Sequence, residues 1–364
     1  MRIVFDCRSV FEGMGGIGRA TACLARELPR ALQAQGRELV LLYGSRRPRE
    51  TGVHGVEEVT ADAAMIDPEF EQIRLPALLE ELKADVYHNP CFSTPLAPGA
   101  TKTVATVHDV VFRRRPELVE PKLRKYLDRW TAASCEYANA VITVSEFSRR
   151  EIRELYGRDP NVVPNAVSED FFQIKRERVS GPPYVLYVGS IEPKKNVEEL
   201  ILGFDALCAK RKRLEHHLVL VGSLTYMPAV PERLKPRVHL LGHVPEDHLR
   251  KLYGGASAFA YLSEYEGFGL PPLEAMAAGI PTVVADRTSL PEVTDGAAEL
   301  VDPSKPEDVA RGLQVALKDI DELRVVRGRK AAARFSWAQS ARMLALIYDV
   351  VTKPSLRVLV GGPK

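Results

Sequence analysis

The sequence predicts an α/β protein built from two doubly wound domains, each with a parallel sheet. The chain has 364 residues, which exceeds the ~100–200 residues of a typical domain. Short apolar runs alternate with amphipathic helical runs from end to end, a pattern typical of parallel sheets with crossover helices. The polar stretch QIKRERVSGPP at residues 173–183 breaks this alternation once, so we expect a linker there.

The first domain is expected to cover residues 1–175. Apolar side chains from Ile17 to Leu32 recur at helical spacing after the first strand, which predicts an amphipathic helix. A charge-rich helical stretch follows at residues 117–138. The predicted strands are residues 2–6, 38–44, 84–90, 102–109, 139–145 and 161–167.

The second domain is expected to cover residues 176–335, with a helix from about residue 196. A last helix at about 336–351 carries enough apolar residues to be packed. In doubly wound sheets, ligands bind beyond the C-terminal ends of the strands, and a cleft between two such units is the default site. The predicted strands are residues 184–190, 217–223, 238–244, 257–263 and 280–286.

Composition excludes several classes of protein. Hydrophobic residues make up 45% and charged residues 27% of the chain, and the formal net charge of +2 does not indicate a nucleic-acid binder. Five scattered cysteines favour free thiols in a reducing compartment over a structural zinc site. Neither a secretory signal nor a membrane span is predicted. We therefore expect a cytoplasmic protein, with contact at the inner membrane face left open.

The stretch SEYEGFGLPPLEAMAAG at residues 263–279 places two carboxylates around a turn. Pro271 and Pro272 suit the first turn of a helix, where a missing N–H costs nothing. That helix would run through Glu274 and stop at Gly279. Its N-terminus would point out of the C-terminal edge of the sheet, where ligands bind.

Backbone and carboxylates in this turn are suited to a phosphate or a polyol. The amides near Gly269 and Leu270 lie at the positive end of the helix dipole. Glu266 is placed to accept hydrogen bonds from sugar hydroxyls, and Glu274, expected in the first helical turn, to reach a ribose. The alternative is a solvated Glu266 and a Glu274 that only favours helix initiation. The remaining residues assigned to this binding turn are Gly267 and Phe268.

Glu266 and Glu274 form an E-x7-E motif, and EGFGLPPLEAMAAGIPTVVAD (266–286) resembles the signature of retaining glycosyltransferases of family 4. The resemblance implies a GT-B fold, with two facing Rossmann-like domains and a cleft between them. It further implies that the first domain binds the acceptor, that the second binds a nucleotide-diphosphate sugar, and that neither metal nor other cofactor takes part. In that fold the helix at 336–351 returns to the first domain.

Motifs in the first domain extend the resemblance. In EGMGGIGRA (12–20), the amides of Gly15 and Gly16 would face the donor diphosphate and the acceptor. The same stretch satisfies G-x-G-x-x-G, the dinucleotide-binding pattern. However, the first strand ends too many residues before the first glycine, and the second strand does not end in the acid that would hold a ribose. A nicotinamide-dependent oxidoreductase remains an alternative.

TVHDVVF (106–112) puts His108 and Asp109 at the end of a strand. In the family this histidine lies against the donor sugar, whereas a purely structural histidine is the alternative. VSEFSRREI (144–152) resembles a segment that borders the cleft, and Ser148 with Glu151 equally fits a capping box.

YVGSIEPKKNVEEL (187–200) resembles the donor-phosphate motif of the second domain. Lys195 occupies the family's lysine position, where it would neutralise the leaving diphosphate. Ser190 replaces the usual arginine, and Lys194 is the candidate second cation. The alternative is a pair of lysines on an exposed turn.

Two weaker motifs complete the site. His243 and Val244 match a segment whose backbone lies near the nucleotide base. The one D-x-D triplet, Asp319 to Asp321, is interpreted as part of a solvated face, so we predict no metal site.

Residues 113–129 are locally basic, with seven arginines and lysines against Glu117, Glu120 and Asp128. Three interpretations stay open: a solvated helix face, a site for an anionic acceptor such as a lipid-linked diphosphate, and peripheral contact with an anionic membrane.

The resemblance thus implies a metal-independent retaining hexosyltransferase, and we expect Glu266, His108 and Lys195 to be its catalytic residues. The donor that best fits the resemblance is GDP-mannose, as in mannosyltransferases of surface-polysaccharide synthesis, with UDP- and dTDP-sugars as alternatives. The acceptor would be a glycan, a lipid-linked species or a small molecule. A non-catalytic pseudo-glycosyltransferase is a further alternative because of Ser190.

Overall fold

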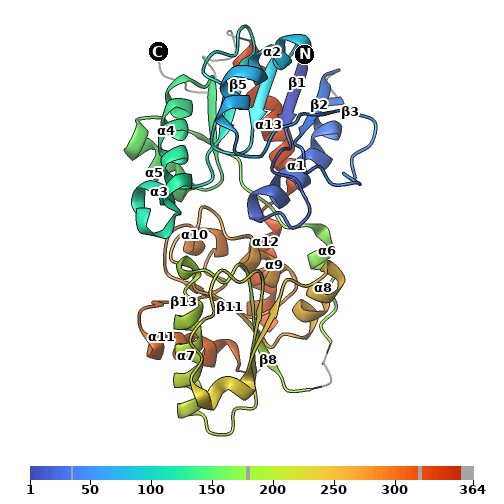
Figure 1. Ribbon diagram of the computed structural model, residues 1–364. Coiled ribbons are helices and arrows are strands. Elements are labelled where there is room, and N and C mark those ends of the chain that lie inside the picture. The colour runs from blue at the N-terminus through green and yellow to red at the C-terminus, as the bar shows by residue number, and fades with distance from the viewer. Residues whose placement is uncertain (34–35, 178–180, 319–321, 354–364) are drawn as a thin grey trace. The chain divides into compact units, whose positions relative to one another are not determined.

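The computed structural model describes residues 1–33, 36–177, 181–318 and 322–353 (Figure 1). The chain divides into two compact units. The first comprises residues 1–166 and the segment that starts at Ser336, and the second comprises Val167–Phe335. Both are Rossmann-like α/β units.

The sheet of the first unit is parallel throughout. Its described strands are β1 (Arg2–Asp6), β2 (Glu38–Tyr43), β3 (Glu57–Thr60), β4 (Val86–Asn89), β5 (Lys102–Thr106), β6 (Ala140–Thr143) and β7 (Asn161–Val162). They lie in the order β3-β2-β1-β4-β5-β6-β7. The order reverses between β1 and β4, which makes the ends of these two strands the topological switch point of the unit.

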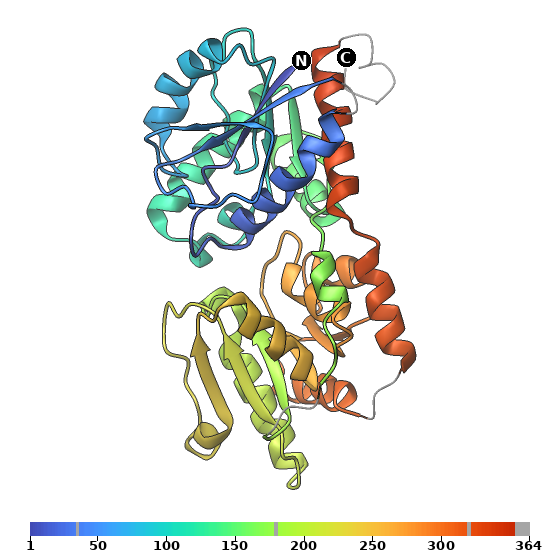
Figure 2. The ribbon, with the colours of Figure 1, turned by 90° about the vertical axis from the view of Figure 1, so that its right-hand side faces the viewer.

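Helices flank this sheet, and the last helix of the chain is one of them. The described helical segments are α1 (Gly16–Gln33), η1 (Phe70–Arg74), α2 (Leu75–Glu81), α3 (Val111–Arg114), η2 (Pro116–Leu118), α4 (Pro121–Tyr137), α5 (Glu146–Tyr156) and α13 (Trp337–Thr352). Figure 2 shows α13 alongside α1. Its Leu344, Tyr348 and Val351 share a core with Ile3 and Leu28, so the burial of apolar surface holds α13 to the first unit.

The second unit repeats the same design. Its described strands are β8 (Tyr184–Val188), β9 (His217–Val221), β10 (Val238–Gly242), β11 (Ala258–Tyr261), β12 (Thr282–Ala285) and β13 (Glu299–Val301). They are parallel and lie in the order β10-β9-β8-β11-β12-β13. The switch point therefore lies between β8 and β11, and every residue of these two strands is buried, as expected for central parallel strands.

The helical segments of the second unit lie before, between and after these strands. They are α6 (Glu169–Phe172), η3 (Pro193–Lys195), α7 (Val197–Lys210), η4 (Glu232–Arg237), α8 (Glu246–Gly255), α9 (Leu270–Ala277), α10 (Leu290–Thr294), α11 (Pro306–Ala316) and α12 (Glu322–Ala333).

The division between the units falls after Ala166, nine residues before the boundary predicted at 175, and the predicted position is wrong for a clear reason. The segment after Ala166 packs on the second unit. Phe171 contacts Tyr253 edge-on, with ring centroids 5.3 Å apart. Arg176 donates to the carbonyls of Tyr253 (3.0 Å) and Ala256, at the C-terminal end of α8.

Two strands were not predicted from the sequence, β3 and β13. Both lie at the edges of their sheets. β3 reads Glu-Glu-Val-Thr with no buried residue, and β13 has three residues of which one is buried. Edge strands need less apolar sequence than central strands, so neither shows the pattern on which strand prediction relies.

A buried histidine links α13 to the sheet of the first unit. The Nδ1 atom of His88 lies 2.7 Å from the Tyr348 hydroxyl, and Nε2 lies 2.8 Å from the Thr106 hydroxyl. Burial, with a smaller contribution from His108, lowers the pKa of His88 to about 3. The ring is therefore neutral at physiological pH, and both of its nitrogens are hydrogen-bonded.

We expect Tyr348→Phe to lower the free energy of unfolding by about 1–3 kcal/mol, because a buried nitrogen of His88 loses its partner. Tyr137→Phe is the matched control, since Tyr137 is 62% exposed, and it should change stability by less than about 0.5 kcal/mol. Urea denaturation measures both. Equal effects of the two substitutions would contradict the role assigned to the His88 contact.

Candidate active site

The loops after β8 and β11 meet at the switch point of the second unit. Lys195 ends the turn η3, and Asn196 follows it in the left-handed conformation, with φ of 51°. The Asn196 side-chain amide donates to the Leu262 carbonyl at 2.9 Å. The Glu264 amide donates to the Lys194 carbonyl at 2.7 Å. These bonds hold the two loops together and bring Lys195 to Glu266.

Lys195 and Glu266 form a largely buried ion pair. Their side chains are 11% and 15% exposed. The Tyr261 hydroxyl, at the end of β11, accepts from Lys195 Nζ at 3.0 Å and donates to Glu266 Oε1 at 2.8 Å. The alternatives of a solvated Glu266 and of a Lys195 on an exposed turn are therefore wrong.

Electrostatics keep both members of this pair charged. Burial alone would raise the pKa of Glu266, but the Lys195 ammonium and its hydrogen bond outweigh burial, and the pKa is lowered. Burial alone would lower the pKa of Lys195, but the Glu266 carboxylate outweighs it, and the pKa is raised. The site thus contains a charged Lys195 ammonium that is paired with the Glu266 carboxylate.

The turn between Glu266 and α9 is fixed by hydrogen bonds to its backbone. The Glu266 amide donates to the Thr288 hydroxyl at 3.1 Å. The Ser289 hydroxyl donates to the carbonyls of Glu266 and Phe268, at 2.9 and 3.0 Å. Phe268 is buried against Phe335, with ring centroids 5.2 Å apart, so its side chain supports the turn from inside.

Gly269 is required by the backbone and by the space around it. Its φ is 104°, and a Cβ there would lie 2.7 Å from the Leu290 side chain. Gly267 precedes it in the turn, and Leu270 begins α9 directly after it. The helix therefore starts where the sequence predicted, with both prolines in its first turn.

Glu274 lies deeper than the sequence predicted. It is the fifth residue of α9, beyond the first turn, and it is 2% exposed. The Tyr253 hydroxyl donates to its Oε2 at 3.0 Å. The ring of Tyr253 packs against Phe171 and Phe259. We expected Glu274 in the first turn of α9, either to reach a ribose or only to favour helix initiation. That position is wrong, because the first turn of α9 contains no acid.

Ser190 and Lys194 share a different carboxylate. The Ser190 hydroxyl donates to Glu192 Oε1 at 2.7 Å, and Lys194 Nζ lies 3.5 Å from the same oxygen. The structure therefore does not bring Lys194 to Glu266, the partner of Lys195. The two weaker predictions, His243 and Val244, follow β10, the former exposed and the latter buried.

In the first unit, the glycine loop separates into residues with different roles. Gly15 precedes α1 and Gly16 begins it, and a Cβ added at either position would meet no atom within 4 Å. A Cβ on Gly18 would lie 2.3 Å from the Ser9 carbonyl oxygen. Packing therefore requires Gly18, whereas Gly15 and Gly16 leave open space at the end of the helix.

His108 follows β5 and is held by its own unit. Its Nε2 lies 2.8 Å from the Pro90 carbonyl. Since a carbonyl only accepts, Nε2 carries the proton, and Nδ1 is an acceptor in the neutral ring. Burial lowers the pKa of His108 despite the opposing effects of Pro90 and Asp109. Asp109 Oδ1 accepts from the Val111 amide at 3.0 Å, at the start of α3.

The predicted capping box at Ser148 is wrong. The residue that caps α5 is Ser145, whose hydroxyl accepts from the Ser148 amide at 3.0 Å. Ser148 instead donates from its own hydroxyl to the His108 carbonyl at 3.0 Å, and Glu151 pairs with Arg114. This segment thus fixes the backbone that carries His108.

Sequence reasoning missed a buried charged network at the switch point of the first unit. Arg8 Nε lies 2.8 Å from Asp6 and its Nη2 lies 3.2 Å from Glu71, with all three side chains at most 3% exposed. The hydroxyl of Tyr87 donates to Asp6, and that of Tyr126 donates to Glu71. Two opposite charges at the end of a buried strand, Asp6 as its last residue and Arg8 two residues later, were a signal for this network.

The described residues contain no group of three or more histidines, cysteines, aspartates or glutamates that could hold a metal ion. The predicted solvated face at Asp319 to Asp321 lies outside the described residues. Among the described helices, none is both long and apolar enough to cross a membrane.

Comparisons with known proteins decide the family. The profile described as "Glycosyltransferase Family 4" matches residues 14–171, and the profile described as "Glycosyl transferases group 1" matches residues 168–334. An MMP alpha-(1->4)-mannosyltransferase from Mycolicibacterium hassiacum is 30% identical over 322 residues, which cover 80% of this chain and 77% of that protein. The chain belongs to glycosyltransferase family 4.

Further relatives match this glycosyltransferase over nearly its whole length. An O-antigen chain mannosyltransferase B from Escherichia coli is 29% identical over 373 residues, covering 93% of this chain and 96% of that protein. The solved sucrose-phosphate synthase from Thermosynechococcus elongatus has a TM-score of 0.73 and 20% identity, covering 99% of this chain and 100% of that chain. The fold is thus GT-B, and the nicotinamide-dependent alternative is set aside.

We expect Tyr261→Phe to make this glycosyltransferase more sensitive to acid. The Tyr261 hydrogen bond helps to lower the pKa of Glu266, so its loss raises that pKa. The acidic limb of the kcat/KM profile should then move to higher pH, with a loss at neutral pH of up to about tenfold, as for one hydrogen bond to a charged group.

The control for this prediction is Tyr184→Phe. Its hydroxyl also makes a hydrogen bond in the second unit, to the Leu252 carbonyl at 2.8 Å. A shift of the acidic limb in both variants, or in neither, would contradict the role assigned to Tyr261.

Proposed function

We propose that this glycosyltransferase retains configuration while it moves mannose from GDP-mannose to an acceptor in the assembly of a surface polysaccharide. The observation that carries the proposal is the Lys195–Glu266 pair with Tyr261 at the switch point of the second unit. The choice of mannose is supported by the mannosyltransferases among the relatives, one of them an O-antigen chain enzyme.

The nucleotide of the donor is the finer part of the proposal. A HepE structure from Anabaena holds UDP and glucose and has a TM-score of 0.68 at 18% identity to this chain. A likeness at this identity supports the fold alone and does not identify the donor. UDP- and dTDP-sugars therefore remain the alternatives to GDP-mannose. Glu274 is proposed to reach the ribose, and the backbone near His243 and Val244 to lie by the base.

The proposed chemistry starts with an exchange of partners at Lys195. As the bond between sugar and diphosphate breaks, negative charge grows on the diphosphate, and Lys195 turns from Glu266 to that charge. Glu266 is then free to accept hydrogen bonds from the sugar hydroxyls. The turn amides near Gly269 and Leu270 add the positive end of α9. Lys194 would reach the diphosphate only if its ion pair with Glu192 broke.

Retention would come from the departing phosphate itself. A front-face displacement lets the leaving oxygen accept the proton of the attacking acceptor hydroxyl, so no enzyme nucleophile is needed. His108 supplies Nδ1 as an acceptor for a sugar hydroxyl, because Pro90 holds its proton on Nε2. Gly15 and Gly16 would give the acceptor and the diphosphate close access to backbone amides.

The setting of the reaction is part of the same proposal. All five cysteines are free thiols, which fits a reducing compartment such as the cytoplasm. The acceptor is a glycan, a lipid-linked glycan or a small molecule. Residues 113–129 provide the basic surface by which we propose peripheral contact with the inner membrane face.

A panel of sugar nucleotides tests the donor. GDP-mannose, UDP-glucose, ADP-glucose and dTDP-glucose are compared by thermal shift and by transfer to a mannose-containing glycan. A ligand that binds only the folded chain raises its melting temperature by mass action. GDP-mannose should give the largest shift and a glycosidic product. A shift without any glycosidic product would favour a non-catalytic homologue, and turnover with a UDP-sugar alone would overturn the choice of GDP-mannose.

Lys195→Ala and Glu266→Ala should each lower kcat by about 10²–10³-fold, as is usual when one group that stabilises transition-state charge is removed. Lys235→Ala is the matched control in the same unit, because Lys235 forms an exposed pair with Glu232. Initial-rate kinetics with the donor identified above measure all three. Unchanged turnover in the Lys195 and Glu266 variants would refute the site.

Metal chelation tests the proposed chemistry independently. Because Lys195 is proposed to carry the charge of the leaving diphosphate, the initial rate should change by less than about twofold in excess EDTA. A rate that collapses in EDTA and returns with magnesium would contradict the proposal.

A further inference from the structure

The loop that follows β4 carries a strained residue. Phe92 has a φ of 66°, which lies in the left-handed region that an aromatic residue rarely adopts. Among the residues that the structure describes, five other than glycine have a positive φ, and Phe92 is the one aromatic of the five. Two of the others, Asn196 and Thr288, belong to loops of the candidate active site in the second unit. Such strain persists only where surrounding contacts impose it, and it concentrates at functional sites.

Hydrogen bonds of the backbone impose this conformation on Phe92. Its own amide donates to the Thr106 carbonyl, at the end of β5, at 2.9 Å. Two residues later, the Thr94 amide donates to the Ser134 hydroxyl of α4, also at 2.9 Å. Phe92 and Thr94 are both buried. A buried amide that loses its partner is costly, so these bonds oppose any relaxation of the loop.

The buried charged network around Arg8 holds the same loop through Ser93. The Ser93 hydroxyl donates to Glu71 Oε2 at 2.7 Å, and Arg8 Nη2 lies 3.2 Å from Oε1 of the same carboxylate. The Tyr126 hydroxyl of α4 donates to Glu71 at 2.9 Å. This network takes no part in the proposed chemistry, but it fixes the residue next to Phe92.

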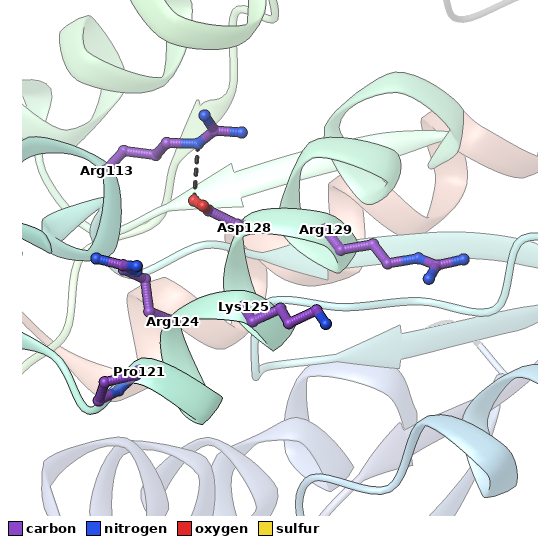
Figure 3. Close-up of a pocket in the computed structure, with 6 residues that line it drawn as sticks. All are labelled: Arg113, Pro121, Arg124, Lys125, Asp128 and Arg129. Carbon is purple, nitrogen blue, oxygen red and sulfur yellow. Dashed lines mark ion pairs between the residues drawn. The ribbon is translucent and has the colours of Figure 1, made fainter.

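Helix α4 connects this loop to the segment that follows His108. Two side chains of α4 bond to the loop or to its network, as described above. The helix is also joined to α3 by the ion pair between Arg113 Nε and Asp128 Oδ1, which are 2.8 Å apart (Figure 3). Since α3 begins at Val111, three residues after His108, one helix holds both the loop after β4 and the segment after β5.

The ring of Phe92 packs against the ring of His108. Their centroids are 5.9 Å apart and their planes meet at 62°, the edge-to-face arrangement that aromatic rings prefer. Phe112 packs on Phe92 in a similar way, with centroids 6.2 Å apart. Phe92 and His108 are only 7% and 8% exposed. The strained loop thus places an aromatic ring between water and the imidazole of His108.

The loop after β4 contacts His108 at a second point. The Pro90 carbonyl accepts from Nε2, which leaves Nδ1 as the acceptor of the neutral ring. Burial is the largest of the causes that act on the pKa of His108, and it lowers that pKa. The titratable groups beside the ring are Asp109 in the same loop and His88 on β4. Any water admitted by the loss of Phe92 would reduce the effect of burial.

We propose that Phe92 is a positioning residue for His108. The loop after β4 keeps Phe92 in its strained conformation, and contact between the two rings fixes the imidazole with Nδ1 as its hydrogen-bond acceptor. The positioning can be tested in the free protein. Its consequence for catalysis rests on the proposed function, in which Nδ1 of His108 accepts from a sugar hydroxyl.

NMR of the full chain, labelled with ¹⁵N and ¹³C in its histidine rings, measures the state of His108. A His108→Asn variant assigns the signals. The nitrogen shifts report which ring nitrogen carries the proton, and a pH titration reports the pKa. Initial-rate kinetics with the nucleotide-sugar donor identified above are measured over the same pH range.

Two variants remove the aromatic contact in different ways. Phe92→Leu removes the ring and keeps much of the apolar volume, whereas Phe92→Gly also accepts a φ of 66° without strain. The matched control is Phe204→Leu, because Phe204 is fully buried in the second unit. Circular dichroism and melting temperature verify that all three variants fold.

The wild type should show His108 as the neutral tautomer protonated on Nε2. In both Phe92 variants the pKa of His108 should rise, so a doubly protonated ring without an acceptor appears at higher pH. The acidic limb of kcat/KM should move to higher pH, with a loss of about two- to tenfold at neutral pH, as for one aromatic contact. Phe204→Leu should change neither the tautomer nor the pKa of His108.

The proposal is overturned if His108 keeps its tautomer and pKa in both Phe92 variants, whatever happens to kcat/KM, or if Phe204→Leu changes them equally. A change at His108 with unaltered kcat/KM would count against the proposed role of His108 in transfer and leave its positioning by Phe92 standing. The NMR result also stands if no donor gives turnover, because it is obtained without substrate.

Discussion

The architecture of the candidate site depends on the ion pair between Lys195 and Glu266. Two charges that are largely removed from water are tolerable because they face each other, and removing either would leave the other buried and unpaired. The pair also joins two loops that are 71 residues apart in sequence. The Lys195 ammonium is thus neutralised by Glu266 within the second unit itself. In the mechanism proposed above, a diphosphate competes with Glu266 for Lys195, which favours ligands that bring both negative charge and hydroxyls for the released carboxylate.

Much of this arrangement could be predicted from the sequence because parallel sheets gather residues by a simple rule. Central strands such as β8 and β11 are buried on both faces and read as apolar runs, and their C-terminal ends meet at one edge of the sheet. Lys195 and Glu266 follow those ends, so their meeting was foreseeable. The helix start at Pro271 and Pro272 was also encoded locally, by residues that fit a first turn.

What could not be predicted depends on contacts between distant elements. Tyr261 reads as one more apolar core residue of AFAY, and only the register of β11 puts its hydroxyl between Lys195 and Glu266. The burial of Glu274 depends on Tyr253 of α8, which no local pattern connects to α9. Likewise, Ser148 looked like a helix cap because nothing in its neighbourhood revealed the His108 carbonyl as its partner.

The docking of α13 on the first unit has a consequence for synthesis on the ribosome. The core around Ile3 and Leu28 stays without Leu344 and Tyr348 until almost the entire described chain has been made. The second unit, by contrast, is one continuous segment, Val167–Phe335, and all of its strands emerge earlier. Domains generally fold in the order of their synthesis, yet here the unit that begins first is completed last. During that interval the uncovered apolar face of α1 and the sheet is exposed to aggregation or to capture by chaperones.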